Sequence, residues 1–391
     1  MKKLQIIAVL LLMNICLFAQ STTLTLSTWD YTNSFHVNNT NTTSLFKVTL
    51  NGQVGVYQSS PRAQLEVGGI EGLLVTGTYN SGTALSLGAG VRLHWYPRKG
   101  AFRAGAAETS YWDDANIGVY SIAMGYQPRA TGALSVAIGG YNYATGVGSL
   151  VLGRYCTASG INSIAIGYGI TASGPYSMAL GNGANTNGMD GAVVIGDNTI
   201  LQTAYASNDN QLTMRFAGGY KFYTNSECTI GATISGNGNS WGTISDSTKK
   251  ENIAIADGEY FLNNLSKLRL GSWNYKTQDA KQFRHYGPMA QEIFLYFGKD
   301  EYGTIGNDTT LATADMDGIM MICLQALEKR TEELKMEFAV SEGKWKTENV
   351  EMKKENEEMK NEITELKKGF EEMKSLVAGL KKESSIKLVE K

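Results

Sequence analysis

The chain has 391 residues, of which 42% are hydrophobic, and its formal net charge is −2. This length allows about two or three domains, and a charge so close to zero argues against a protein that binds nucleic acid. The sequence contains 44 glycines but only 5 prolines, which indicates repeated tight turns rather than disorder.

Residues 1–19 have the pattern of a secretory signal peptide. Two lysines precede an apolar run over residues 4–18, and Ala19 supplies the small residue expected at a cleavage site. A buried strand or a membrane anchor is the alternative, but the apolar run is too short to span a bilayer comfortably. Because no later stretch predicts a transmembrane helix, we expect an exported protein that is secreted or held at the cell surface without a transmembrane anchor.

The cysteines and histidines predict neither disulfides nor a metal site. The cysteines that follow the signal peptide are Cys156, Cys228 and Cys323. An odd number at wide spacing in an exported chain argues against a disulfide framework. The histidines are His36, His94 and His285. No two of them have the spacing of zinc ligands, so we expect no metal ion and no cofactor.

Residues 20–114 predict a β-rich N-terminal segment that ends in a cap. Asn51-Gly52 lies between two stretches of alternating polar and apolar residues and predicts a hairpin turn. Aromatic and basic residues are then concentrated between Arg92 and Asp114. Such a cluster suits a platform for glycans or nucleic acid, because aromatic rings stack and arginine binds anions. We favour a cap on the repeats that follow, since the terminal units of repeat folds are atypical.

Residues 115–200 contain a repeat with a strict period of 14. Each copy begins with serine and ends with glycine, and large apolar residues alternate with a small one between them. The copies begin at Ser121, Ser135, Ser149, Ser163 and Ser177. An Ala-Thr-Gly or Ala-Ser-Gly tripeptide recurs between them with the same period. Such a length allows two short strands and two turns, which is one coil of a solenoid.

The strand in each repeat has two different faces, because strand side chains alternate. Ile122 and Met124 represent the face with large apolar residues, and Ser121, Ala123 and Gly125 represent the face with small residues. We expect the apolar face to fill the coil and the small face to let a neighbouring sheet or subunit approach closely. A glycine-rich phosphate loop is excluded, because no glycine cluster opens a helix.

These repeats resemble the collagen-binding head of trimeric autotransporter adhesins, the YadA-like head. The resemblance implies a left-handed parallel β-roll in a homotrimer of a bacterial surface protein, and we expect a host or matrix glycan or protein as ligand of the head. The repeat slips by one residue at 192–196, which we interpret as a closing coil. No segment resembles the four-strand outer-membrane anchor of autotransporters, which separates the protein from a conventional surface adhesin.

Residues 201–244 continue as strands and turns, and we interpret them as a neck that leads to Ile244. The next residues include Ser245 and Lys250, the residue types of a serine–lysine dyad. A serine hydroxyl is a weak nucleophile until a base takes its proton. A lysine acts as that base only when burial or a nearby cation lowers its pKa from about 10.4 towards about 7–8. Lys249 would supply such a cation, whereas Asp246 would oppose it.

The motif Ser-Asp-x-x-x-Lys-x-Asn-Ile, which begins at Ser245, is followed by Leu265–Arg269 and by Arg284–Glu292. Together these motifs resemble the intramolecular chaperone of phage endosialidase tailspikes and tail fibres, which also occurs in bacterial proteins and in myelin regulatory factors. In that family the domain trimerises, templates the trimeric stalk before it, and cuts itself off just ahead of the serine. The resemblance covers about residues 245–335. It departs at Ser247–Lys249, where many members carry an Arg-Leu pair before the lysine.

The resemblance implies a cut between Ile244 and Ser245, with Ser245 as nucleophile and Lys250 as base. His285 lies in the segment that matches the family's Gly-x-x-Ala-Gln region and would orient the site or act on the ester, with a structural polar role as the favoured alternative. At most the chain is then an autoproteolytic serine peptidase that acts on itself.

A polysaccharide-degrading, tailspike-like hydrolase with the same chaperone is the alternative function. Glycosidases need a pair of carboxylates that face each other across the scissile bond. Asp113 and Asp114 are adjacent, so on a strand they point apart and do not form such a pair.

Residues 331–391 predict a coiled coil behind a chaperone domain at 245–330. Large apolar residues recur every seven positions at Met352, Met359, Leu366, Met373 and Leu380, and again at Ile363, Phe370 and Val377. This is an a/d seam, and a solvated single helix is the alternative. Asn349 and Asn356 fall on the a positions. Such Asn residues favour dimers in simple peptides, but the resemblance implies trimers.

The predicted protein is mainly β: a parallel β-roll head with 14-residue repeats, then a small α+β chaperone domain and a C-terminal α-helical coiled coil. We expect an exported homotrimeric, fibre-like or adhesin-like protein whose chaperone domain drives trimer assembly.

Overall fold

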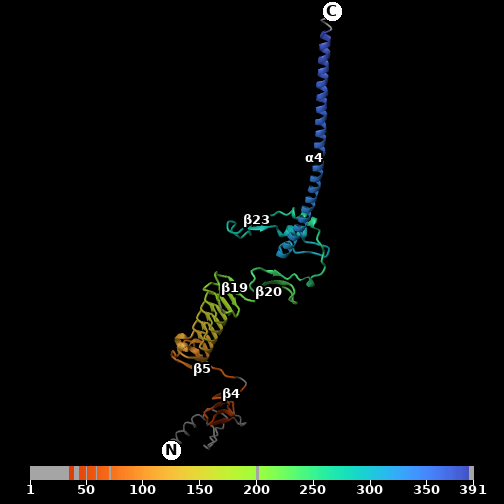
Figure 1. Cartoon of the computed structure of the whole chain (residues 1–391). Helices are drawn as coiled ribbons and strands as arrows, with labels where there is room; N and C mark the ends of the chain where they lie inside the picture. Colours follow the sequence, from red (N-terminus) through yellow and green to blue (C-terminus); the bar gives the residue numbers. More distant parts are fainter. Residues whose placement is uncertain are drawn as a thin grey trace, which may run out of the picture. The chain divides into compact units, whose positions relative to one another are not determined.

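The computed structural model describes residues 35–38, 44–49, 51–58, 60–69, 72–199 and 202–386, and the predicted signal peptide lies outside them. The chain divides into two compact units, Met1–Gly218 and Gly219–Lys391, and each is described by itself (Figure 1).

The first unit begins with a small sheet. Its strands, in spatial order, are β1 (Phe35–Asn38), β2 (Ser44–Val48), β3 (Val54–Val56) and β4 (Leu65–Val67). Asn51-Gly52 lies between the antiparallel strands β2 and β3, and Gly52 has a φ of +76°. The predicted hairpin turn is therefore confirmed.

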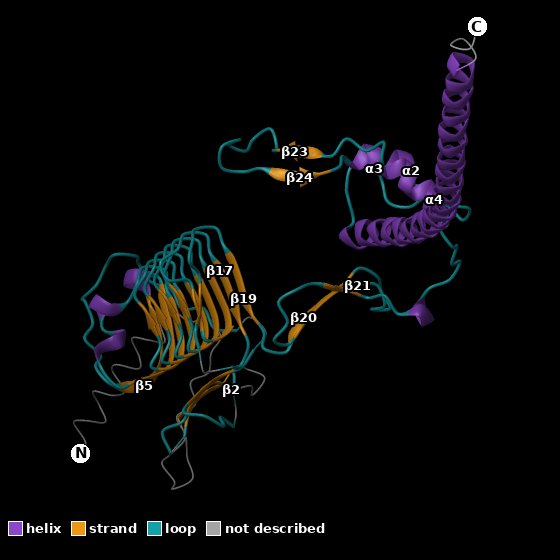
Figure 2. Cartoon of the chain, turned by 45° about the horizontal axis from the view of Figure 1, so that its top comes forward, coloured by secondary structure: helices purple, strands orange, loops and turns teal. Residues whose placement is uncertain are grey.

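The repeats form a solenoid of two facing parallel sheets (Figure 2). Within the described residues, the larger sheet consists of β5 (Gly90–Tyr96), β6 (Ala101–Ala107), β7 (Ile122–Tyr126), β9 (Val136–Gly140), β11 (Leu150–Arg154), β13 (Ile164–Tyr168), β15 (Met178–Asn182), β17 (Val193–Gly196) and β19 (Leu212–Arg215). The smaller sheet consists of β8 (Arg129–Ala130), β10 (Tyr143–Ala144), β12 (Thr157–Ala158), β14 (Thr171–Ala172), β16 (Ala184–Asn185) and β18 (Ala204–Tyr205). Each 14-residue repeat contributes one long and one short strand, so the predicted coil is confirmed.

The solenoid extends beyond the expected limits of 115–200. Among the described strands of the roll, only the β5–β6 pair at one edge is antiparallel, and β6 already pairs in parallel with β7. At the other edge, the one-residue slip is absorbed where Met178 pairs with Val193. The strand β19 continues the ladder past this slip, so residues 192–196 do not close the roll.

The two faces of the long strands are the reverse of the prediction. Ala123, Ala137 and Ala165 have an exposed fraction of 0% inside the coil, whereas Ile122 and Met124 on the outer face of β7 are each 37% exposed. The expectation that the large apolar residues fill the coil is therefore wrong. The reason is the size of the coil, because a loop of so few residues leaves room between its sheets only for small inward side chains on the long strands, such as alanine and valine.

Serine and glycine complete this narrow interior. The buried Ser135 hydroxyl donates to the carbonyl of Gly132 at 2.6 Å, which satisfies a polar group that would otherwise be costly to bury. The same contact to the glycine three residues earlier recurs at Ser121, Ser149, Ser163 and Ser177. Gly139 has a φ of +115°, and a Cβ there would lie 2.0 Å from the carbonyl oxygen of Gly153 in the next coil. Packing and hydrogen bonding inside the coil therefore determine which residues recur in the repeat.

The β5 end of the solenoid is closed by residues of the aromatic and basic cluster. The short 3₁₀ helices η1 (Pro97–Lys99), η2 (Ser110–Trp112) and η3 (Asp114–Asn116) lie at this end (Figure 2). Trp112 is completely buried, and its indole N–H donates to the carbonyl of Pro128 at 3.0 Å. The buried Arg103 guanidinium donates to the carbonyls of Ser121 and Ala130, and burial lowers its pKa to about 10.

The second unit combines a small sheet with helices. Its elements are β20 (Gly219–Tyr223), β21 (Gly231–Ser235), β22 (Gly242–Thr243), the 3₁₀ helix η4 (Ser247–Lys249), α2 (Gly258–Leu265), β23 (Gly271–Trp273), β24 (His285–Gly287), α3 (Ala290–Phe297) and α4 (Thr313–Ile386). Strands β20, β21 and β22 form an antiparallel sheet, and β23 pairs with β24.

The helices of this unit pack at the beginning of α4. The chain approaches closely there, because a Cβ on Gly258 of α2 would lie 2.7 Å from the Cβ of Ala326. Arg330 of α4 also forms an ion pair with Glu259 of α2. Cys323 and Phe297 are buried in this small core. Farther along, α4 exposes its apolar side chains to water in the single chain.

Candidate autoproteolytic site

A tight turn connects Ser245 to Lys250. Asp246 is the N-cap of η4, and its Oδ1 accepts hydrogen bonds from the Thr248 amide at 3.0 Å and from the Thr248 hydroxyl at 2.8 Å. The backbone closes the turn twice, since the Lys249 amide donates to the carbonyl of Asp246 and the Lys250 amide donates to the carbonyl of Ser247. The turn folds residue 250 back towards residue 245.

The structure brings two of the three predicted site residues together. Lys250 Nζ lies 2.6 Å from Ser245 Oγ, a side-chain hydrogen bond, and both residues are exposed in the single chain. At this distance a neutral amine would accept the hydroxyl proton directly, as a general base must.

The charge of Asp246 is engaged within its own turn. Hydrogen bonds from the Thr248 amide and then from its hydroxyl hold the pKa of the Asp246 carboxyl below its usual range, and the nearby charge of Lys249 acts in the same direction. Within the part of the chain that the structure describes, no carboxylate forms an ion pair with Lys250. The sequence predicted that Asp246 would oppose the base; it missed its role as a cap, which the Asp-x-Thr spacing indicates.

The bond between Ile244 and Ser245 lies between two ordered elements. On its N-terminal side, β22 pairs with β21, and the Ile244 amide donates to the carbonyl of Gly231 at 3.3 Å. On its C-terminal side, the capped turn begins directly after Ser245. The peptide bond is therefore held from both sides, while Ser245 itself stays open to water.

His285 lies in the β23–β24 hairpin. Its Nε2 is 3.1 Å from Oε1 of Gln278, and its ring packs against Trp273 and Tyr275 with centroid distances of 4.8 and 5.6 Å. No hydrogen bond joins His285 to Ser245 in the described chain. Its contribution to the site stays a prediction.

Asp113 and Asp114 are both used to hold the cap of the head. The Asp113 Oδ1 accepts hydrogen bonds from the amides of Leu87 and Gly88 at 2.6 and 2.8 Å. Asp114 accepts a hydrogen bond from the Tyr96 hydroxyl at 2.7 Å, and this contact is the main reason why the pKa of its carboxyl is lowered. Both carboxylates are thus committed to structural contacts.

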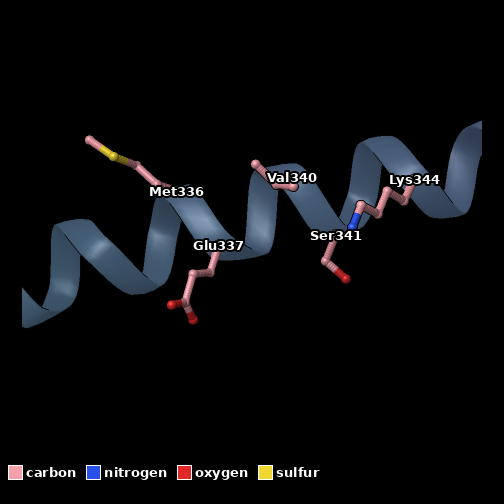
Figure 3. Close-up of a pocket in the computed structure, with 5 residues that line it drawn as sticks. All are labelled: Met336, Glu337, Val340, Ser341 and Lys344. Carbon is pink, nitrogen blue, oxygen red and sulfur yellow. The ribbon is translucent and has the colours of Figure 1, made fainter.

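The described residues contain no group of three or more histidine, cysteine or acidic side chains that could hold a metal ion. One side of α4 carries a pocket lined by Met336, Glu337, Val340, Ser341 and Lys344, whose side chains are drawn in Figure 3. Ser341 and Lys344 both line it, but no hydrogen bond joins them in the described chain, and the mixed lining is that of an exposed helix surface.

Models of known protein families match both the head repeats and the segment that contains the candidate site. Residues 117–142, 130–155, 144–169 and 172–199 match the YadA head domain repeat, and residues 245–297 match the chaperone of endosialidase. The chain carries a YadA head and an endosialidase-type chaperone domain. The chaperone match begins at Ser245, the residue that pairs with Lys250. No curated protein matches the chain.

The helices that the structure describes include none with a long enough apolar stretch to cross a membrane.

Proposed function

We propose that the protein is an exported, homotrimeric fibre that presents its head at the cell surface. Its C-terminal chaperone domain drives trimer assembly and then cuts the chain between Ile244 and Ser245. The observation that carries this proposal is the outward-facing apolar surface of the head.

This outer apolar face follows the long strands from coil to coil. Its members include Val91, Leu93, Ile122, Met124, Ile138, Ile166 and Leu212, all at least 36% exposed in the single chain. Val91 and Leu93 on the edge strand β5 are 85% and 76% exposed. A soluble monomer rarely leaves a continuous apolar surface of this length in water. Further copies of the same chain, packed around a common axis, would cover it.

The long helix α4 supports the same conclusion. Met359, Leu366 and Phe370 on its predicted seam are 53%, 73% and 59% exposed in the single chain. A coiled coil buries such a seam by inserting each apolar side chain between four residues of a partner helix. The head and the helix belong to one chain, so both must assemble with the same number of copies. Three copies suit both domain families.

The geometry of the turn supports a self-cleavage reaction. Lys250 takes the proton of the Ser245 hydroxyl, and Oγ attacks the carbonyl carbon of Ile244. Lys250 then gives this proton to the Ser245 nitrogen as the bond between the nitrogen and the carbonyl carbon breaks, which leaves an ester to Oγ and a free amine on Ser245. Water then hydrolyses the ester, so Ile244 becomes a C-terminal carboxylate and Ser245 regains its hydroxyl. No cofactor is needed.

The exposure of the pair favours a cut that follows assembly. A general base must be neutral to take the hydroxyl proton, and both Ser245 and Lys250 are exposed in the single chain. Neighbouring chains of the trimer would cover the pair and favour the neutral amine. Cleavage would therefore occur once per chain and release the chaperone domain only from assembled heads.

The surface location rests on the predicted signal peptide and on the adhesin-type head. The head would then bind a host or matrix glycan or protein, and its many coils would present the same surface repeatedly.

Truncation of the chain after Ile244 tests the assembly function. The head should then misassemble, because parallel strands that are distant in sequence fold slowly and expose their edges meanwhile. The matched control is the full-length Ser245→Ala variant, which keeps the chaperone attached and should form trimers. Light scattering and resistance to protease report the outcome. Soluble, protease-resistant trimers from the truncated chain would contradict the proposal.

A further inference from the structure

The contact between Ser245 and Lys250 depends on the shape of the residues between them. In an extended chain each residue advances by about 3.3 Å, so the two Cα atoms would lie about 16 Å apart, beyond the reach of a lysine side chain. A 3₁₀ turn advances by only about 2.0 Å per residue. With η4 formed, Nζ lies 2.6 Å from Oγ.

One side chain secures this turn. A helical segment as short as Ser247–Lys249 is not stable alone in water. Residues 245–250 are all exposed, so no packed core holds them in the single chain. What remains is the carboxylate of Asp246, whose Oδ1 receives both the amide and the hydroxyl of Thr248.

We propose that Asp246 is a positioning residue of the cleavage site, which fixes the turn that presents Lys250 to Ser245. The carboxylate takes no part in the proton transfer. Thr248 is its partner and supplies two donors from one residue. This inference rests on the proposed self-cleavage and explains how the site tolerates its departure from the family pattern at Ser247–Lys249: the turn is capped from within.

A direct electrostatic role for Asp246 is the competing explanation. The charged groups beside Lys250 in the chain are Asp246, Lys249 and Glu251, and none forms an ion pair with it in the described structure. Asparagine caps a helix as well as aspartate does but carries no charge. Asp246→Asn therefore separates the two roles, since it keeps the cap and removes the charge.

The experiment follows cleavage of the full-length chain over time after cell-free translation, across a range of pH. Loss of a cap costs about 1 kcal/mol, which corresponds to about a five-fold lower rate. Asp246→Ala should cut about five-fold more slowly at every pH, without a shift in the pH of half-maximal rate. Asp246→Asn should stay within about two-fold of the wild type. Light scattering must show the same trimer mass for both variants.

Three results would overturn the inference: Asp246→Ala cuts at the wild-type rate, Asp246→Asn is as slow as Asp246→Ala, or Asp246→Asn shifts the pH of half-maximal rate. If Asp246→Ala fails to assemble, the cleavage rates of Thr248→Val and Thr248→Ser are compared instead. Only the serine variant keeps the hydroxyl donor to Asp246, so equal cleavage rates for these two variants would also overturn the inference. A wild-type chain that stays whole refutes the proposed cleavage itself, and the inference with it.

Discussion

Enlarging a small residue inside the coil should destabilise the head more than reshaping a large residue outside it. Ala165 in β13 has an exposed fraction of 0%, and its ladder neighbours Val151 and Ala179 are equally buried. Ala165→Leu forces an isobutyl group into this space, while hydrogen bonds to β11 and β15 prevent the strand from moving away. Overpacking of this kind costs typically about 1–3 kcal/mol.

The melting temperature reports this cost. For a unit of this size, each kcal/mol lowers the melting temperature by about 2–4 °C, so Ala165→Leu should lower it by about 2–12 °C. The matched control is Ile166→Leu, on the same strand but on the outer face, where the volume is conserved and the cost stays below about 1.5 kcal/mol. Circular dichroism measures both transitions. If Ala165→Leu melts like the wild type while Ile166→Leu melts early, the assignment of inner and outer faces is wrong.

Two further predictions concern the helix and the end of the roll. Leu366→Lys places a charge in the proposed seam and should weaken the trimer by about 3–5 kcal/mol. Light scattering should then show a lower mass that recovers as the protein concentration rises. The control Glu365→Lys, beside the seam, should leave the mass unchanged. An unchanged mass for Leu366→Lys would count against the coiled coil. The pKa of Asp197 is lowered from its ordinary 3.8 to about 2, mainly by the Ala217 amide. A lowered carboxyl pKa stabilises the folded state above the ordinary value, and this contribution is lost as the pH falls from about 4 to about 2. Hydrogen exchange near β19 should therefore rise over this interval, and less so in Asp197→Asn; equal acid sensitivity would refute the assignment.

Periodicity and residue type were sufficient to predict the solenoid, because its backbone repeats with the sequence. Serine and glycine recur since each fills one position of a coil: Ser135 bonds to the Gly132 carbonyl, and Gly139 contacts the next coil. The alternation of side chains predicted two faces for each strand. It did not predict which face is inside, because that depends on the distance between the two sheets, which no local pattern encodes.

The candidate site was predictable in part for a similar reason. Ser245 and Lys250 are close in sequence, so a single turn brings them together. The hydrogen bond by which Asp246 caps the turn at Thr248 is also local. From the sequence, however, Asp246 was interpreted as a charge that opposes the base and not as the cap of a turn. His285 comes from a distant hairpin, and its position relative to the pair depends on tertiary packing that spacing alone does not determine.

The central claim is that an assembled chain cuts itself at Ser245, and mass spectrometry of the purified wild type beside Ser245→Ala tests it most directly. The wild type should yield two fragments, one that ends at Ile244 and one that begins at Ser245. Ser245→Ala should remain whole and trimeric, because loss of the nucleophile lowers such rates by about 10⁴- to 10⁶-fold. An intact wild-type chain, or a Ser245→Ala chain cut at the same bond, would contradict the account.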